Sequence, residues 1–487
     1  MKNILNNIDM GWNFDNSYLS LPDKLFTKIN PTPVSSPSIV LLNFNLAKKL
    51  GLKINDLDSF ALVASGNLVP TDSSPIAQAY AGHQFGNFTI LGDGRAILLG
   101  EHIDPSSERW DIQLKGSGRT PYSRGGDGRA ALGPMLREYI ISEGMNGLNI
   151  PTTRSLSVAL TGDSVKREKS LSGSILLRVA SSHIRVGTFE YASLKLSNHE
   201  KKALLDYTID RHFPECWEDK NPYISFLDKV ILRQAKLIAM WQSVGFIHGV
   251  MNTDNMSING ETIDYGPCAF MDEYNNKTVF SSIDLYGRYA YGNQPYIAAW
   301  NLARFAETII EFLDNKKETA IEIAQARVSR FSELYSSYYL EIMGRKIGID
   351  KVKPSDEVLI KDILKIMEET KSDFTNTFLD LTFERHSESK IYTHPDFNTW
   401  NLRWLDRLKE ENSSKKDTIS LMKKSNPAVI PRNYFVEEAI KDATENQNYS
   451  KIYKLINAIS DPYSHDDYKK EFASPPFGKN YKTYCGT

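Results

Sequence analysis

Hydrophobic positions in the first part of the chain alternate with a period of two, which is typical of strands. In the segment 76–103, small, glycine and β-branched residues alternate in a way that indicates strands joined by tight turns. The segment 174–193 shows strand-like alternation as well. A Gly-Asp-Gly-Arg sequence at 92–95 separates two apolar runs, so we expect a hairpin turn there.

Helical spacing of apolar residues dominates after about residue 195. Before that point, a short helix closed by Gly51 and one longer helix are expected. One amphipathic pattern ends at Gly245, and glycine is a frequent helix terminator. The predicted helices cover residues 41–52, 131–145, 225–246, 295–315, 316–343 and 355–371. Strands followed by helices predict an α+β fold.

Composition and charge narrow the class of protein. The chain has 487 residues, is 41% hydrophobic, and carries 58 Lys and Arg against 60 Asp and Glu. This length allows two or three domains or one large two-lobed body. The balanced charge argues against a nucleic-acid-binding protein, which would need a basic excess.

The distribution of apolar residues and cysteines bears on the compartment. No run of about eighteen apolar residues occurs, and the first residues resemble neither a secretory signal nor a transit peptide. Cys216, Cys268 and Cys485 lie far apart, without a CxxC pair. We therefore expect no membrane association, a cytoplasmic location and, as the favoured oligomeric state, a monomer.

The stretch from His248 to Asp264 carries the strongest chemical signal. It places Asn255 in a loop and Asp264 at the start of an Asp-Tyr-Gly triplet. Amide and carboxylate oxygens are hard ligands that suit Mg²⁺ or Mn²⁺, with nucleotide phosphates completing the coordination. In kinases, a catalytic-loop Asn and the Asp of Asp-Phe-Gly have these roles. The plain structural alternative is a turn at 254–255 and a capping residue at 264.

The position of the catalytic base differs from that of a kinase. A kinase carries its base five residues before the metal-binding Asn. That position here is Val250, which cannot accept a proton, and the nearest carboxylate is Asp254. Two interpretations follow from the residues alone. Either the chain only binds nucleotide, or it catalyses a different reaction at a different phosphorus.

Glycine clusters and basic residues precede this loop. Glycine-rich turns at 92–94, 116–118 and 125–128 allow backbone N–H groups to approach phosphates. Lys115 ends an apolar strand pattern, as does the phosphate-binding Lys of kinases, and Glu138 in the next helix is its candidate partner. Arg178 and Arg185 could hold a triphosphate, although a structural ion pair is the ordinary alternative for such arginines.

Several long motifs together resemble the selenoprotein O family, also called YdiU-like. They are YAGHQFGNF (80–88), LGDGRA (91–96), QLKGSGRTPYSRGGDGRAALG (113–133), HGVMNTDNMSINGETIDYGP (248–267), YGRYAYGNQP (286–295) and NPAVIPRN (426–433). The resemblance covers nearly the whole chain. It implies a protein-kinase-like two-lobed fold that binds ATP in a reversed orientation and transfers AMP to Ser, Thr or Tyr hydroxyls of proteins. UMP transfer from UTP is also attributed to some members.

The resemblance also implies roles for individual residues. Asp254 matches the proposed base, Asn255 and Asp264 the metal ligands for Mg²⁺ or Mn²⁺, and Glu138 the partner of the strand lysine. The matched nucleotide-binding positions are Gly92, Gly94, Arg95, Lys115, Asp127, Gly128, Arg178, Arg185 and Asp264. Protein substrates, the chain itself included, are the implied partners, and ATP is the co-substrate.

The same resemblance suggests the division of the chain. We expect an N-terminal extension at 1–72, a β-rich N-lobe at 73–194, a helical C-lobe at 195–400 and a C-terminal extension at 401–487. Residues 264–294 stand in the place of the activation segment of kinases. In some bacterial members a cysteine in this segment can pair with a C-terminal cysteine. Phe280 stands at the matching position here, which puts redox control through Cys485 in doubt.

Two other functions stay open at this point. One is a nucleotide-binding pseudokinase that acts as a scaffold. The other is a phosphotransferase acting on a small molecule or a protein, against which the lack of a carboxylate at Val250 weighs.

Overall fold

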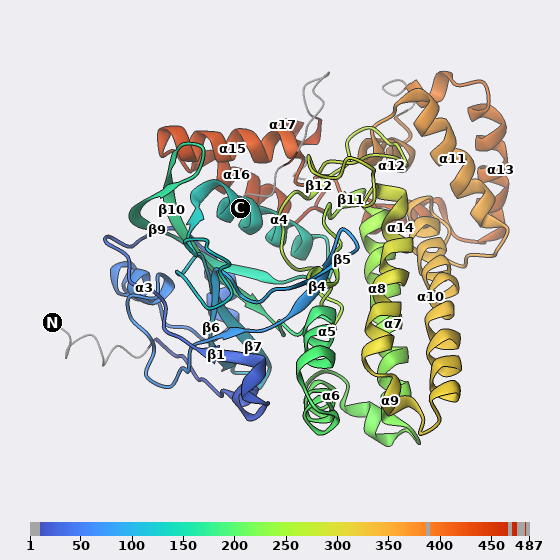
Figure 1. The fold of residues 1–487 in the computed structure, drawn as a ribbon. Helices are drawn as coiled ribbons and strands as arrows, with labels where there is room; N and C mark the ends of the chain where they lie inside the picture. Colours follow the sequence, from blue (N-terminus) through green and yellow to red (C-terminus); the bar gives the residue numbers. More distant parts are fainter. Residues whose placement is uncertain (1–9, 386–389, 466–469, 475–482, 484–487) are drawn as a thin grey trace.

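An antiparallel sheet organises the first part of the chain. The computed structural model describes residues 10–385, 390–465, 470–474 and 483, which form a mixed α/β structure (Figure 1). The sheet has the order β1-β3-β6-β7-β10-β9-β2, with β8 paired to β10. Its strands are β1 (Phe26–Lys28), β2 (Ser38–Leu42), β3 (Ile76–Gln78), β6 (Ala96–Ile103), β7 (Arg109–Lys115), β8 (Ala130–Ala131), β9 (Arg154–Lys166) and β10 (Ser170–Ala180).

The two faces of this sheet pack on different helices. On β10, Ile175 and Leu177 belong to a core shared with α2 (Phe44–Lys49) and α3 (Leu57–Ala64), whereas Leu176 belongs to the core around α4 (Leu132–Gly147). Side chains alternate between the faces of a strand. Arg178 therefore lies on the α4 face. It pairs in register with Gln113, and Lys115 pairs with Leu176, so both strands direct polar groups to that face.

A separate two-stranded hairpin lies beside the sheet. It consists of β4 (Ala81–Gln84) and β5 (Asn87–Ile90), with its turn at Phe85-Gly86, where both residues have positive φ. The prediction of a hairpin turn at 92–95 was wrong. The backbone N–H of Leu91 donates to the carbonyl of Tyr80, and that of Asp93 to the carbonyl of Gln78, so the hydrogen-bond ladder continues beyond β5. Residues 92–95 therefore connect the β4–β5 sheet to β6 of the large sheet.

The strand pattern expected over 174–193 holds only for its first part. Strand β10 ends at Ala180, and helix α5 (Val186–Lys195) begins after Arg185. Val186, Phe189 and Ala192 recur every three residues and are buried, which is a helical pattern and not a strand pattern. The backbone N–H of Arg185 donates to the Thr188 hydroxyl at 3.2 Å at the start of this helix.

Helices make up most of the chain after β10. Figure 1 shows α7, α8 and α10 standing side by side across from the sheet, with the β4–β5 hairpin between the two parts, and α15 and α16 beside α4. The α-helices that follow α5 in the described residues are α6 (Asn198–His212), α7 (Pro222–Ser243), α8 (Gln294–Thr308), α9 (Ile310–Leu313), α10 (Lys317–Lys346), α11 (Asp356–Thr370), α12 (Phe374–Phe383), α13 (Phe397–Glu410), α14 (Lys415–Ser425), α15 (Asn433–Asn446), α16 (Ser450–Ile459) and α17 (Lys470–Ala473).

A two-stranded sheet of β11 (Phe246–Ile247) and β12 (Ala269–Phe270) frames the loop that contains Asp254 and Asp264. The helices predicted at 131–145, 225–246, 316–343 and 355–371 are present, with ends shifted by a few residues. The helix predicted at 295–315 is divided at Ile309 into α8 and α9. Within the described part of the chain, no helix is both long and apolar enough to cross a membrane. Cys485 lies outside the described residues.

Candidate active site

A pocket of about 390 Å³ lies between the sheet and the loop after β11. This volume is within the range of small-molecule sites. Its lining brings together all the candidate catalytic, nucleotide-binding and metal-binding residues and the partner of Lys115: Gly92, Gly94, Arg95, Lys115, Asp127, Gly128, Glu138, Arg178, Arg185, Asp254, Asn255 and Asp264. The glycine-rich turns at 92–94 and 125–128, the α4 face of the sheet and the 250–264 loop therefore meet at one place.

Two basic side chains of the sheet share two acidic partners. Lys115 Nζ donates to Glu138 Oε2 at 2.6 Å and to Asp264 Oδ1 at 3.0 Å. Arg178 Nη1 donates to Asp264 Oδ1 at 2.6 Å and to Glu138 Oε1 at 3.2 Å. The pairing of Lys115 with Glu138 that the sequence suggested is thus present. Gln113 holds the other edge of the Arg178 guanidinium through its Oε1.

The Asp264 carboxylate lies among the positively charged side chains of the pocket. Arg185 Nη1 lies 3.3 Å from its Oδ2, so three cations surround one carboxylate. Burial alone would raise the pKa of Asp264, but Lys115, Arg178 and Arg185 together hold it well below its ordinary value. The residue has φ +62°, a left-handed conformation that Asp tolerates better than most residues. This backbone turns the carboxylate toward the sheet.

Asn255 lines the pocket beside Asp254. Its Nδ2 donates to the carbonyl of Val250 at 3.0 Å, so the nitrogen is already used. Asn255 and Asp264 line the same pocket, and one amide and one carboxylate oxygen fit Mg²⁺ or Mn²⁺, for which nucleotide phosphates and water would supply the other ligands.

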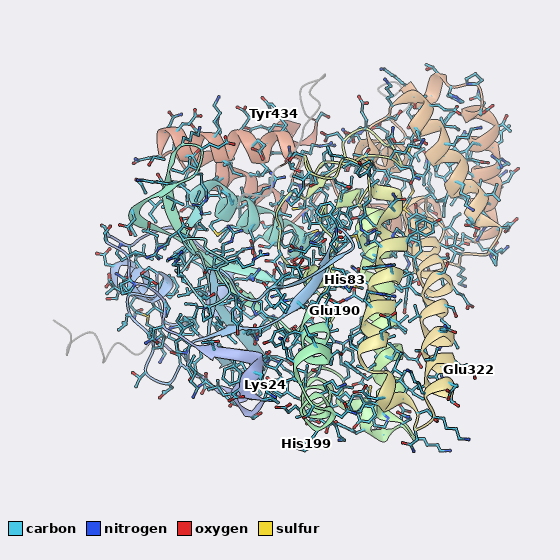
Figure 2. All side chains as sticks on the ribbon, in the orientation of Figure 1. Lys24, His83, Glu190, His199, Glu322 and Tyr434 are labelled. Carbon is cyan, nitrogen blue, oxygen red and sulfur yellow. The ribbon has the colours of Figure 1, made fainter. Side chains whose placement is uncertain are left out.

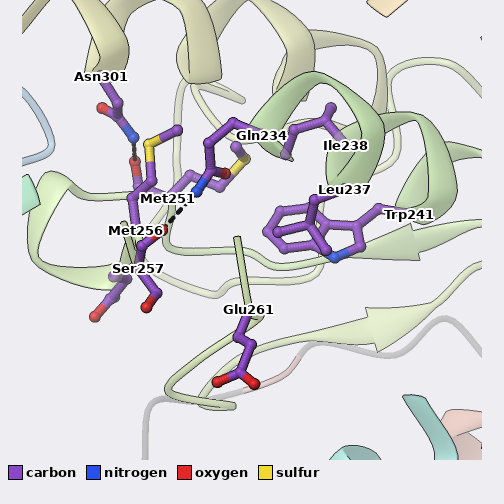
Figure 3. Close-up of a pocket in the computed structure, with 10 residues that line it drawn as sticks. Gln234, Leu237, Ile238, Trp241, Met251, Met256, Ser257, Glu261 and Asn301 are labelled. Carbon is purple, nitrogen blue, oxygen red and sulfur yellow. Dashed lines mark hydrogen bonds between the residues drawn. The ribbon is translucent and has the colours of Figure 1, made fainter. Parts of the chain in front are cut away.

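Helices α7 and α8 brace this loop from behind (Figure 3). Gln234 of α7 donates to the carbonyl of Ser257 at 2.6 Å, and Asn301 of α8 donates to the carbonyl of Met251 at 3.0 Å. These residues also line a second cavity of about 10 Å³. That cavity has room for about one water molecule and not for a nucleotide. The two hydrogen bonds from Gln234 and Asn301 hold the loop in place.

Asp254 is a buried carboxylate with few partners. Its side chain lines the pocket, yet the residue is only 6% exposed. Gln84 Nε2 lies 3.4 Å from Oδ2, and Oδ1 is buried without a hydrogen-bond partner. Burial raises the pKa of Asp254 to about 6, although Arg185 opposes this effect. A carboxylate with such a pKa accepts protons more readily than an ordinary aspartate.

The glycine-rich segment closes the pocket near the sheet. Asp127 and Gly128 line it, and Asp127 is held at the surface by an ion pair with Arg167 at 2.8 Å. Hydrogen bonds from Arg167 lower the pKa of Asp127. Asp127 is therefore an anion at the rim of a pocket that also contains the paired cations Lys115 and Arg178.

Asp93, Tyr80 and Gln84 are among the lining residues that were not singled out from the sequence. Asp93 is buried between Gly92 and Gly94, accepts from the Gln78 backbone at 3.0 Å, and burial raises its pKa to about 6. The sequence feature that could have identified Asp93 as a pocket residue is its position between two glycines of a predicted phosphate-binding turn. Tyr80 and Gln84 gave no signal, since alternation in a hairpin does not reveal what each face contacts. The Arg185 guanidinium stacks 4.3 Å from the Tyr80 ring centre.

Comparison with known proteins agrees with this geometry. The family model described as "Protein adenylyltransferase SelO" matches residues 9–460. The chain belongs to the SelO family. It is 57% identical over 492 residues to the protein nucleotidyltransferase YdiU of Clostridium beijerinckii, covering 100% of both chains. It is 55% identical over 485 residues to the YdiU protein of Bacillus cereus (strain G9842), and 54% identical over 484 residues to that of Geobacillus kaustophilus. These alignments cover 99% of this chain and 99% and 100% of the two relatives.

Proposed function

We propose that this SelO family member transfers AMP from ATP to Ser, Thr or Tyr hydroxyls of proteins, its own chain included, with UTP as an alternative donor of UMP. Membership in the family makes it a protein nucleotidyltransferase. One observation carries the proposed site: Lys115, Asp254 and Asp264 line a single pocket, while the position of a kinase base is occupied by Val250.

Binding of the triphosphate would rest on the cations now held by Asp264. Lys115, Arg178 and Arg185 form fixed donors in a buried setting, where their interaction with phosphate is stronger than in water. Asn255 and Asp264 would hold Mg²⁺ or Mn²⁺, which, when bound, neutralises part of the phosphate charge. Glu138 would keep Lys115 and Arg178 in place after Asp264 turns toward the metal.

The chemical step would be a displacement at the α-phosphorus. The substrate hydroxyl oxygen forms a bond to that phosphorus, and the bond to the bridging oxygen of the β-phosphate breaks. The hydroxyl proton passes to Asp254, and pyrophosphate leaves with the negative charge that the basic residues stabilise. The product is a phosphodiester between AMP and the protein side chain.

We propose a kinase-like two-lobed arrangement for the whole chain. Residues 73–194 would form the sheet-containing lobe and 195–400 the helical lobe, with the pocket between them. Strands β1 and β2 from the 1–72 segment lie at the two edges of the sheet, and α15 and α16 from 401–487 pack on α4. A pocket lined from both the sheet and the 250–264 loop supports this arrangement.

The test uses ATP labelled separately on the α and γ phosphates. The chain and added casein would be incubated with each nucleotide and Mg²⁺ or Mn²⁺, and Asp264→Ala would serve as the inactive control. We expect α-label, and no γ-label, to become protein-bound. Incorporation of γ-label alone would establish a phosphotransferase. Binding of ATP without transfer of either label would favour the scaffold function.

A further inference from the structure

The β4–β5 hairpin is fastened to three consecutive residues of the loop that carries the proposed base. The backbone N–H of Phe85 donates to Asn252 Oδ1 at 3.1 Å, and the N–H of His83 donates to Thr253 Oγ1 at 2.7 Å. Gln84 Nε2 lies 3.4 Å from Asp254 Oδ2. The hairpin therefore contacts each of the loop residues 252, 253 and 254.

Glu190 of α5 ties this contact together. Its Oε1 accepts from His83 Nδ1 at 2.5 Å, and its Oε2 accepts from the Thr253 hydroxyl at 2.6 Å. Figure 2 shows His83 and Glu190 next to each other where the hairpin meets α5. The Glu190 side chain is 4% exposed. One buried carboxylate thus joins three elements that are far apart in the sequence, and bonds to a charged acceptor are stronger than neutral ones.

The hairpin also limits where the Asp254 carboxylate can lie. A Cβ atom on Gly82 would be 2.2 Å from Asp254 Oδ1 and 2.8 Å from its Cγ, so only glycine allows this approach. With Gly82 against Oδ1 and Gln84 near Oδ2, the carboxylate has little freedom to rotate. Glu190 itself does not line the nucleotide pocket.

We propose that Glu190 is a positioning residue of the transfer reaction, which clamps the β4–β5 hairpin onto residues 252–254 and thereby sets the orientation of Asp254. This inference rests on the proposed function of Asp254 as the base. It assigns no contact with substrate to Glu190. Its effect on the reaction is transmitted through His83 and Thr253.

The test compares Glu190→Gln with Asn87→Ala, an exposed position on the same hairpin. Glutamine keeps the size of the side chain but cannot accept both bonds and has no charge. We expect Glu190→Gln to lower the rate of α-label transfer roughly 10- to 100-fold, with ATP affinity by calorimetry changed less than a few-fold. Asn87→Ala should keep the wild-type rate.

Hydrogen exchange supplies a readout that needs no acceptor protein. In Glu190→Gln, amides of 81–90 and 250–256 should exchange roughly 10-fold faster or more, while α7 is unchanged. Wild-type exchange in both segments, or an equal loss of rate and ATP affinity, would overturn the inference. Should Glu190→Gln not fold, Gly82→Ala tests the same clamp, and wild-type transfer by Gly82→Ala would overturn it. If the wild-type chain transfers no α-label, the proposed function fails, whereas the exchange result still decides whether the clamp exists.

Discussion

At the scale of single residues, the site is defined by charge balance around Asp264. Strand alternation places Lys115 and Arg178 on the α4 face of the sheet, and the start of α5 places Arg185 beside them. Three buried cations without an anion would be costly. Asp264 and Glu138 compensate this charge in the nucleotide-free chain, and the triphosphate would take over part of that role.

Replacing Asp264 should separate metal dependence from phosphate binding. We expect Asp264→Ala to abolish the Mg²⁺-dependent part of ATP affinity and to stop transfer, because the carboxylate ligand is lost. ATP affinity without metal should be kept or increased, since Lys115, Arg178 and Arg185 lose a competing anion. Calorimetry with and without Mg²⁺ measures both. Full transfer activity of the variant at saturating Mg²⁺ or Mn²⁺ would show that Asp264 is not a ligand.

At the scale of elements, the glycine-rich segment shows why close backbone approach matters. Gly128 has φ +69°, and a Cβ there would lie 2.1 Å from the carbonyl group of Gly118. Gly125 has φ +86°, but a Cβ there would meet nothing within 4 Å. The two positions share the left-handed backbone and differ in steric contact.

This pair yields a matched prediction. Alanine at Gly125 should cost only the backbone strain, about 1 kcal/mol, and leave ATP affinity nearly unchanged. Alanine at Gly128 should also displace the Gly118 turn and weaken ATP binding at least about 10-fold, as judged from the tight contact. Calorimetry on both variants is the measurement. Equal affinities for Gly125→Ala and Gly128→Ala would show that the 118–128 contact does not shape the pocket.

Much of this site could be predicted because its parts have local signals. Lys115 ends an alternating apolar pattern, and Asn255 and Asp264 lie in a recognisable loop. Their residue types and their order along the chain were therefore enough to predict them as site residues. The β4–β5 hairpin could not be predicted in the same way. Its turn at Phe85-Gly86 lacks the usual Asn-Gly signature, and the more glycine-rich 92–95 segment competed for the assignment. The contact of Glu190 with His83 is long-range and has no local signal.

At the scale of the whole molecule, several histidines are buried in uncharged form. Burial lowers the pKa of His183 to about 4 from its ordinary 6.5, although Asp111, 2.8 Å from its Nδ1, acts in the other direction. His102, His212 and His248 also have lowered pKa values because of burial. The unfolded chain would protonate these groups first as the pH falls.

The stability that these histidines contribute should therefore decrease between about pH 6.5 and pH 4, because their unfolded forms bind more protons in this window. From about pH 7 to about pH 5, we expect His183 alone to lower the free energy of unfolding by about 2 kcal/mol, a term that the raised pKa values of Asp93 and Asp254 oppose. Relative to wild type, the variant His183→Asn should therefore show a smaller drop. The exposed His199, at the start of α6 (Figure 2), provides the control His199→Asn. Urea unfolding at both pH values measures the effect, and an unchanged drop in His183→Asn would contradict it.

The central claim is that Asp254 accepts the hydroxyl proton while its neighbour Asn255 holds the metal. The most direct test measures Mg-ATP affinity and the α-label transfer rate side by side for Asp254→Ala, the isosteric Asp254→Asn, and Asn255→Ala. Loss of a positioned base lowers a rate roughly 10²- to 10⁴-fold. We predict such a loss for both Asp254 variants with affinity within a few-fold of wild type, whereas Asn255→Ala loses both. If the Asp254 variants lose affinity as severely as Asn255→Ala, Asp254 is a metal ligand and the assignment of the base is wrong.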